Sequence, residues 1–172
     1  MIMSLYIEWL NKIKAKATSE WLTESQRKAY DQILTKWANQ QFICLCGPAG
    51  CGKTFVAHIL AREHDYVYSQ EISEVANGSI NVLVDGEEYT RLMRDAAMLK
   101  GLKRVIVVTR KPPQDRMPKA EIVQTDRDVR QFQHNLTTYG ILGSFLKDPQ
   151  TTDLNQVIRA ECIARGEGYA TQ

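Results

Sequence analysis

The sequence of 172 residues contains no apolar run near the roughly 20 residues that a membrane-spanning helix needs. Its first apolar residues are interrupted by Glu8, Asn11 and Lys12, a pattern that a secretory signal peptide does not show. The chain also has no large excess of either charge, because its 22 Lys and Arg are nearly balanced by 20 Asp and Glu. These absences predict a cytoplasmic protein without a membrane partner, and the net charge of +2 alone predicts no other partner.

Cysteine and histidine are too few and too scattered for a disulfide framework or a zinc site. The seven residues of these types are Cys44, Cys46, Cys51, Cys162, His58, His64 and His134. We expect the cysteines to be free, buried thiols. An apolar content of 44% and a charged content of 24% are ordinary for a soluble globular domain, and the length fits one domain.

One segment carries a complete motif, because residues 47–54, Gly-Pro-Ala-Gly-Cys-Gly-Lys-Thr, fit the pattern G-x-x-x-x-G-K-[ST]. An apolar run (residues 41–46) precedes this phosphate loop, and a helix-like run (residues 54–61) follows it. Glycines let the backbone N–H groups curl around an anion at the helix N-terminus. The predicted contacts are Gly47, Pro48, Ala49, Gly50, Cys51, Gly52, Lys53, Thr54 and Phe55. Lys53 would reach the β- and γ-phosphates, and the Thr54 hydroxyl would ligate Mg²⁺.

The phosphate loop and its flanks resemble those of P-loop NTPases. The resemblance implies a nucleoside triphosphate, here ATP, bound with Mg²⁺. It does not say what the energy of hydrolysis is used for, because many activities share the fold.

The segment before the phosphate loop offers two interpretations of Gln26. Leu22, Gln26 and Arg27 resemble a Leu-x-x-x-Gln-Arg run of superfamily 1 helicases, whose glutamine reads adenine. Thr23-x-x-Gln26 is also a capping box, in which the glutamine returns to the N-cap amide of a helix over about 24–39. Both interpretations stay open at the level of sequence.

An apolar run over residues 80–84 ends in Asp85. In a parallel sheet, ligands bind at the C-terminal ends of the strands, which is the position of Asp85. After a phosphate loop, this is the place of a Walker B aspartate that holds Mg²⁺. In AAA+ proteins and helicases a catalytic glutamate follows at once, whereas here Gly86 intervenes before Glu87 and Glu88. We predict Glu87 as the general base, with Glu88 as the alternative. A strand that ends in Asp-Gly also occurs in some P-loop kinases.

The strongest strand signal, residues 104–108, leads into Thr109 and Arg110. In AAA+-like and helicase-like ATPases, the strand after Walker B ends in a polar sensor of the γ-phosphate. Thr109 resembles that sensor, and Arg110 is a second candidate contact. The alternative is a polar strand end that enters a loop. A sensor strand favours the AAA+/RecA-like branch, in which it lies between the phosphate-loop strand and the Walker B strand.

The order of predicted elements alternates between strands and helices. It indicates a three-layer α/β fold with a mainly parallel sheet of about five strands, preceded by two N-terminal helices. We expect a helical extension over residues 1–40, an NTPase core over 41–150, and a C-terminal helix and tail over 151–172. Other predicted elements are a helix over 89–99, a strand over 121–125, a helix from about 126 to 136 and a helix over 154–164, with a tail from Gly166.

Residues 91–130 hold 11 Lys and Arg against 5 Asp and Glu. This excess suits nucleic-acid phosphates, a solvated face, or an arginine acting on a neighbour's nucleotide, with Arg110, Arg116, Arg127 and Arg130 as candidates. We predict an ATPase coupled to nucleic-acid processing, as a motor, loader or regulator subunit. Its partners would be DNA or a DNA-bound complex, in a homo-oligomer or larger assembly. The alternatives are a small P-loop kinase with residues 111–119 as a lid, and a nucleotide-gated assembly protein with weak hydrolysis.

Overall fold

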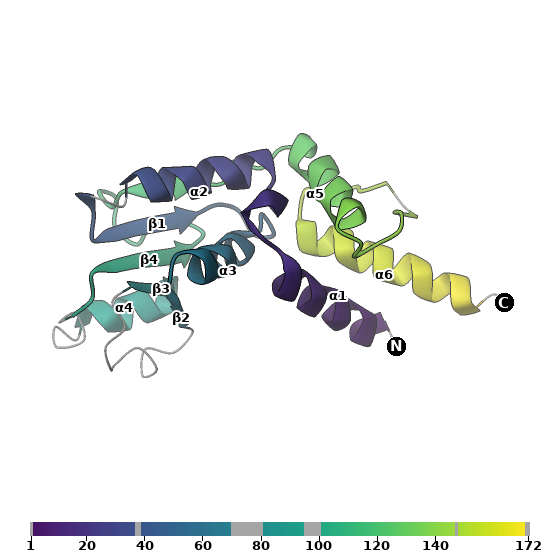
Figure 1. The fold of residues 1–172 in the computed structure, drawn as a ribbon, viewed down its shortest axis with the longest axis horizontal. Coiled ribbons are helices and arrows are strands. Elements are labelled where there is room, and N and C mark those ends of the chain that lie inside the picture. The colour runs from purple at the N-terminus through teal and green to yellow at the C-terminus, as the bar shows by residue number, and fades with distance from the viewer. Residues whose placement is uncertain (1, 37–38, 70–80, 95–100, 147, 171–172) are drawn as a thin grey trace.

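The computed structural model of the protein describes residues 2–36, 39–69, 81–94, 101–146 and 148–170. At its centre lies a five-stranded sheet in the order β2-β3-β4-β1-β5, with every pair of neighbours parallel (Figure 1). The strands are β1 (Phe42–Cys46), β2 (Val67–Ser69), β3 (Asn81–Asp85), β4 (Arg104–Thr109) and β5 (Lys119–Glu121). The predicted α/β fold with a parallel sheet is confirmed, and β4 lies between β1 and β3 as the sequence analysis expected.

Helices cover both faces of this sheet and make the predicted three layers. They are α1 (Ile2–Lys16), α2 (Glu24–Lys36), α3 (Lys53–Glu63), α4 (Gly86–Arg94), α5 (Asp126–Thr138) and α6 (Leu154–Ala170), with a 3₁₀ turn at Ser19–Trp21. Ile33 of α2 and Val56 of α3 share a buried cluster with Leu45 of β1. Tyr89 and Leu92 of α4 belong to a second cluster on the opposite face.

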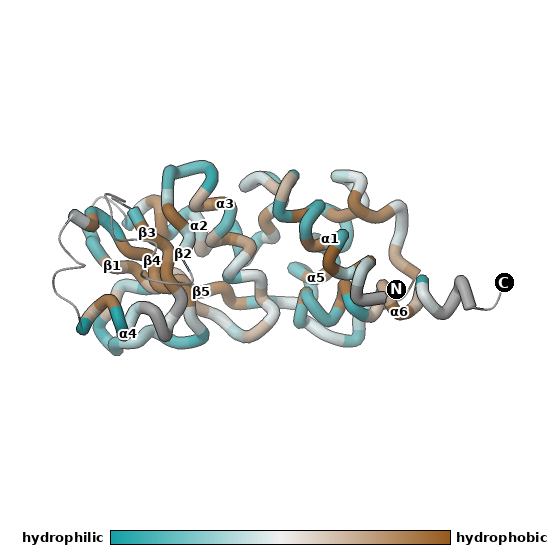
Figure 2. The backbone as a smooth tube through the Cα atoms, turned by 90° about the horizontal axis from the view of Figure 1, so that it is seen from below, coloured by the Kyte–Doolittle hydropathy of each residue, from teal (hydrophilic) through white to brown (hydrophobic). Residues whose placement is uncertain are grey.

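The central strands are apolar on both sides because helices bury both faces of the sheet. Val105, Ile106, Val107 and Val108 of β4 are all buried, with alternate side chains in the two clusters. Figure 2 shows this apolar centre as the brown strands beneath the helices. Removing such side chains from water contributes about 1.5–3 kcal/mol each, which makes β4 the natural core of the sheet.

A group of helices, α1, α5 and α6, lies beside the sheet (Figure 1). The guanidinium of Arg159 in α6 lies 5.2 Å from the ring centre of Tyr6 in α1. Trp21 of the 3₁₀ turn stacks on Tyr139, with ring centres 4.3 Å apart. The boundaries at residues 40 and 150 stay a prediction, although α2 packs on the sheet and α1 packs on α6.

Two predicted elements have different bounds in the structure. The strand expected over 121–125 is β5 at Lys119–Glu121, because its partner β1 ends at Cys46 and Thr125 caps α5. The tail expected from Gly166 is wrong, since α6 continues to Ala170. The i,i+4 ion pair of Glu161 with Arg165 stabilises the helical turn before Gly166 and Gly168. The helix therefore continues despite the low helix propensity of glycine.

The N-terminal part of α4 also differs from expectation, because the helix begins at Gly86 and not at Tyr89. The predicted continuation to residue 99 lies outside the described residues. Among the residues that the structure describes, no helix is both long and apolar enough to cross a membrane.

Candidate functional site

The phosphate loop joins the end of β1 to the start of α3. Its backbone has dihedral angles that residues other than glycine rarely adopt. Gly47, Gly50 and Gly52 have φ values of 156°, 73° and 87°. A Cβ on Gly47 would lie 2.9 Å from the carbonyl oxygen of Ile122, and a Cβ on Gly52 would lie 2.3 Å from Nε2 of Gln26. The loop therefore needs glycine both for its dihedral angles and for its neighbours.

Lys53 and Thr54 occupy the first turn of α3, where backbone N–H groups have no partner within the helix. The Lys53 ammonium donates to the carbonyl oxygens of Gly47 at 2.9 Å and Pro48 at 2.6 Å. The side chain is thus folded along the loop, and its three N–H donors suit phosphate oxygens at the same place. Thr54 is exposed at this helix N-terminus. This donor set and the glycine cradle fit a polyphosphate with its Mg²⁺.

Gln26 is buried at 1% exposure and joins α2 to the phosphate loop. Its Oε1 accepts a hydrogen bond of 3.1 Å from the Thr23 N–H, so the glutamine returns to the N-cap amide as the capping-box interpretation expects. Its Nε2 donates to the Cys51 carbonyl oxygen at 3.0 Å, a contact that the sequence analysis missed. Adenine contact by Gln26 stays a prediction, and it would require the amide to give up one of these bonds.

The start of α6 also contacts the loop. The Leu154 N–H donates to the Gly50 carbonyl oxygen at 3.0 Å, and the Asp153 carboxylate lies where a Gly50 side chain would be. Asp153 also caps α6 by accepting from the N–H groups of Asn155 and Gln156 at 2.9 and 3.2 Å. No local signal in the sequence places Asp153 beside Gly50.

The ends of the neighbouring strands bring the other predicted residues to the same edge of the sheet. Thr109 is the register partner of Cys46, the residue before the phosphate loop, and Asp85 is the partner of Val108. A Cβ on Gly86 would lie 2.8 Å from the Thr109 hydroxyl, so this hydroxyl lies against the backbone that follows Asp85. Glu87 and Glu88 lie in the first turn of α4. The side chains of Asp85, Glu87 and Glu88 lie outside the described ones.

The proline-rich segment between β4 and β5 is anchored at its far end. Met117 is 8% exposed and packs in the same cluster as the β1 cysteines, while the Pro118 carbonyl oxygen accepts from the Cys44 N–H at 2.8 Å. A lid over the phosphates would have to break both contacts in order to move. Arg110 and Arg116 of this segment are exposed.

The cysteines near the loop are buried thiols, as expected. Burial raises the pKa of Cys44 to about 12 and also raises the pKa of Cys46 and Cys51 above the ordinary value. Thiols of this kind stay protonated and unreactive near neutral pH. They act here as small apolar side chains under the phosphate loop.

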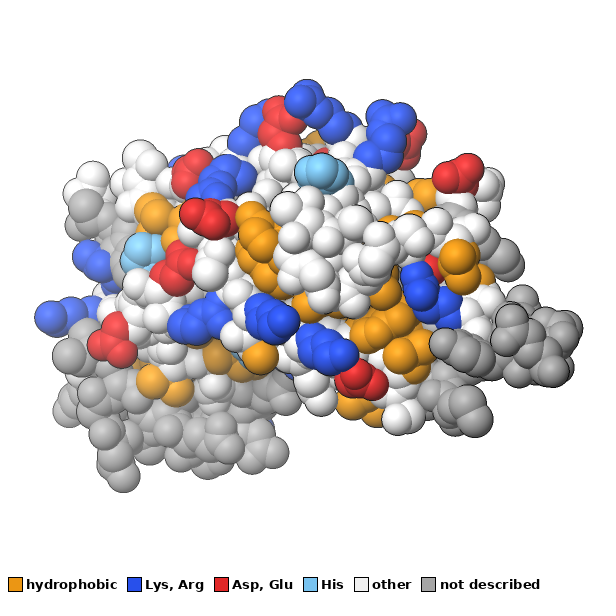
Figure 3. Space-filling model, turned by 45° about the vertical axis from the view of Figure 1, so that its right-hand side comes forward, with side chains coloured by type: hydrophobic (Ala, Val, Ile, Leu, Met, Phe, Trp, Pro, Cys, Tyr) orange, Lys and Arg blue, Asp and Glu red, His pale blue; other side chains and the backbone are white. Residues whose placement is uncertain are grey.

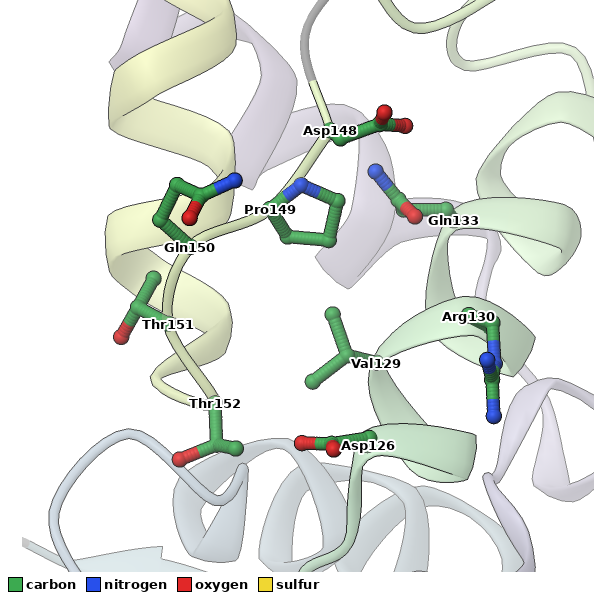
Figure 4. Close-up of a pocket in the computed structure, with 9 residues that line it drawn as sticks. All are labelled: Asp126, Val129, Arg130, Gln133, Asp148, Pro149, Gln150, Thr151 and Thr152. Atoms are coloured by element: carbon green, nitrogen blue, oxygen red, sulfur yellow. The ribbon is translucent and has the colours of Figure 1, made fainter.

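A pocket of about 730 Å³ lies between α5 and the segment that leads into α6 (Figure 4). Its walls are mostly polar and are formed by Asp126, Val129, Arg130, Gln133, Asp148, Pro149, Gln150, Thr151 and Thr152. The Asp126 carboxylate points toward Thr152, next to the start of α6. Of the residues singled out in the sequence, this pocket includes Arg130.

The basic residues between positions 91 and 130 lie on separate surfaces. Arg91 and Arg94 lie on α4, whereas Arg127 and Arg130 lie on α5, which is part of the helical group. Arg127 is paired with Glu24 at 3.1 Å, and both side chains are exposed. Figure 3 shows basic and acidic side chains interspersed on the face that it presents. The local excess in the sequence is thus divided in space.

A comparison with protein-family models matches residues 6–85 to the Rad17 P-loop domain, just under half of the chain. The matched stretch runs from α1 through the phosphate loop to Asp85 at the end of β3. No curated protein matches the chain. The parallel sheet, the phosphate loop and this match lead to one conclusion: the chain has the fold and the nucleotide-binding loop of a P-loop NTPase.

Proposed function

We propose that this chain is an ATPase that binds ATP with Mg²⁺ on the phosphate loop and uses hydrolysis in nucleic-acid processing. The observation that carries the proposal is the position of β4 between β1 and β3, which puts Thr109 between the loop and Asp85. This order is the one expected of the AAA+/RecA-like branch. The match of residues 6–85 to a Rad17 P-loop domain supports the coarser part of the proposal, a P-loop NTPase.

Each residue of the site has a role that its position supports. Backbone N–H groups of the loop and the Lys53 ammonium hold the phosphates, and Thr54 and Asp85 would hold Mg²⁺. When bound, Mg²⁺ neutralises the charge that develops on the phosphate oxygens. The Thr109 hydroxyl is the proposed contact with the γ-phosphate, and Glu87 is the proposed base. Arg110 is a second proposed contact with the phosphates.

The proposed coupling to nucleic acid is supported by fewer observations than the proposed nucleotide binding. Basic residues lie at several surfaces, and an arginine such as Arg116 or Arg130 could serve a neighbouring copy or a partner. We therefore propose that the chain acts as a motor, loader or regulator subunit within a homo-oligomer or a larger DNA-bound assembly. A kinase lid over residues 111–119 is disfavoured by the anchoring of Met117 and Pro118.

The proposal is tested by phosphate release from ATP, with and without single- and double-stranded DNA. We expect turnover that is lost in Lys53→Ala and that rises when DNA is added. A turnover rate that neither single-stranded nor double-stranded DNA changes would contradict the coupling to nucleic acid. Lys53-dependent binding with negligible turnover in every condition would instead support the nucleotide-gated assembly protein.

A further inference from the structure

We propose that Gln26 is a positioning residue that sets the shape of the phosphate loop and acts on every ligand with a polyphosphate, whatever its base. The inference rests on the proposed ATP binding and goes beyond it, because it gives Gln26 a role that neither adenine contact nor helix capping includes. Its basis is the pair of hydrogen bonds that the buried amide makes to Thr23 and Cys51.

The orientation of the Gln26 amide is fixed by its two partners. The Thr23 N–H can only donate, so it must face Oε1, and the Cys51 carbonyl can only accept, so it must face Nε2. A flipped amide would put like groups together in both places. Since the side chain is 1% exposed, water cannot compensate for a lost partner.

The Cys51 carbonyl is a sensitive point at which to hold the loop. Cys51 lies between Gly50 and Gly52, both with positive φ, so its peptide groups are the ones that local torsion could turn. The N–H groups of these same peptides face the anion in a phosphate loop. The Gln26 amide also fills the space that a Gly52 side chain would occupy, which blocks the loop from moving toward α2.

A second hydrogen bond holds the neighbouring peptide. The Gly50 carbonyl accepts from the Leu154 N–H of α6, so consecutive carbonyls of the loop are held by α6 and by Gln26. Loss of the Gln26 bond leaves one of these ties and frees the part of the loop nearest Lys53. The loop would then have to be ordered when a phosphate binds, which weakens binding.

The test compares Gln26→Glu with a matched control. The glutamate keeps an oxygen for the Thr23 N–H but loses the donor to Cys51. Ser25→Ala is the control, because it loses hydrogen bonds at the same helix start, to Val123 and Asp128, and none to the loop. If Gln26→Glu does not fold, Gln26→Met replaces it, with a similar length and no charge; this variant loses the bond to Thr23 as well as the bond to Cys51. Thermal unfolding of each variant sets a measuring temperature below the lowest midpoint.

Affinities are measured for MgATP, MgGTP and inorganic tripolyphosphate, the last by competition. We expect Gln26→Glu to weaken all three by the same factor, about tenfold, with the ratio of ATP to GTP affinity unchanged. Ser25→Ala should leave all three affinities at the wild-type value. A changed ATP to GTP ratio with unaltered tripolyphosphate binding would overturn the inference in favour of adenine contact. Unaltered affinities for all three would also overturn it and leave Gln26 as a cap. If the wild type bound none of the three probes, or if its binding did not depend on Lys53, the proposed function itself would be wrong.

Discussion

The Leu154 N–H donates a hydrogen bond of 3.0 Å to the carbonyl oxygen of Gly50, which joins the first residue of α6 to the phosphate loop. These residues are 104 positions apart in the chain. Asp153 adds to the contact, because its carboxylate fills the space beside the Gly50 Cα. The helical group of α1, α5 and α6 is thus attached directly to the loop that would hold the phosphates.

Gly50→Ala should destabilise the protein and weaken nucleotide binding, because the new Cβ lies 2.1 Å from Cγ of Asp153 at a φ of 73°. Gly140→Ala is the matched control, since Gly140 has a φ of 70° and open space around its Cα. We expect the control to cost about 1–2 kcal/mol from the left-handed backbone alone. Urea unfolding of both variants measures the difference. Equal losses of stability would mean that α6 does not constrain Gly50.

The stability of the fold should fall in acid through Asp128. Burial alone would raise the pKa of this carboxyl, but hydrogen bonds from Ser25 and Thr125 outweigh it and hold the pKa below its ordinary value. A lowered folded-state pKa contributes stability above the unfolded value of about 3.9, and that stability is lost as pH falls through the folded value.

Asp128→Asn tests this contribution. At pH 7 the variant should be less stable by about 2 kcal/mol, because an amide N–H₂ replaces an acceptor that faces the Ser25 hydroxyl and the Thr125 N–H. The difference from wild type should shrink as the pH is lowered below about 4. Urea unfolding at pH 7, 5, 4 and 3 gives the comparison. A difference that stays constant over this range would show that Asp128 does not titrate as described.

Thr109→Ala should lower kcat for ATP hydrolysis by about a hundredfold while KM changes little, if the hydroxyl contacts the γ-phosphate only during the reaction. Thr109→Ser keeps the hydroxyl and should stay near the wild-type rate. Steady-state phosphate release separates the two parameters. Equal hydrolysis rates for Thr109→Ala and Thr109→Ser would show that Thr109 is not a sensor of the γ-phosphate but a polar strand end.

The catalytic base is tested by Glu87→Gln beside Glu88→Gln. Loss of a general base costs about a factor of 10² to 10⁴, so Glu87→Gln should suppress turnover and spare ATP binding. Glu88→Gln should turn over ATP at the wild-type rate. The reverse result would assign the role to Glu88. Full activity in both variants would exclude a base at either position.

Much of the fold follows from local patterns in the sequence. Continuous Val and Ile in β4 indicates a strand buried on both faces, and the glycines of the phosphate loop indicate the turn between β1 and α3. The hydrogen bond between the Thr23 N–H and Gln26 could be predicted because it spans a single turn. These features depend on neighbours that are close in the chain.

The contacts that complete the site depend on residues far apart in the chain. Gln26 reaches Cys51 across 25 positions, and Asp153 reaches Gly50 across more than 100. No spacing rule encodes such pairs. The helix through Gly166 was missed for a similar reason, since helix propensity is local while α6 is stabilised by packing on α1.

The central claim is that the phosphate loop binds a nucleoside triphosphate through Lys53, and calorimetric titration of MgATP into wild type and Lys53→Ala tests it most directly. The account predicts saturable binding by the wild type and a loss of at least about a hundredfold in affinity for the variant, because a charge-assisted contact with the phosphates disappears. Equal affinities of the two proteins for MgATP would contradict the assignment of the loop.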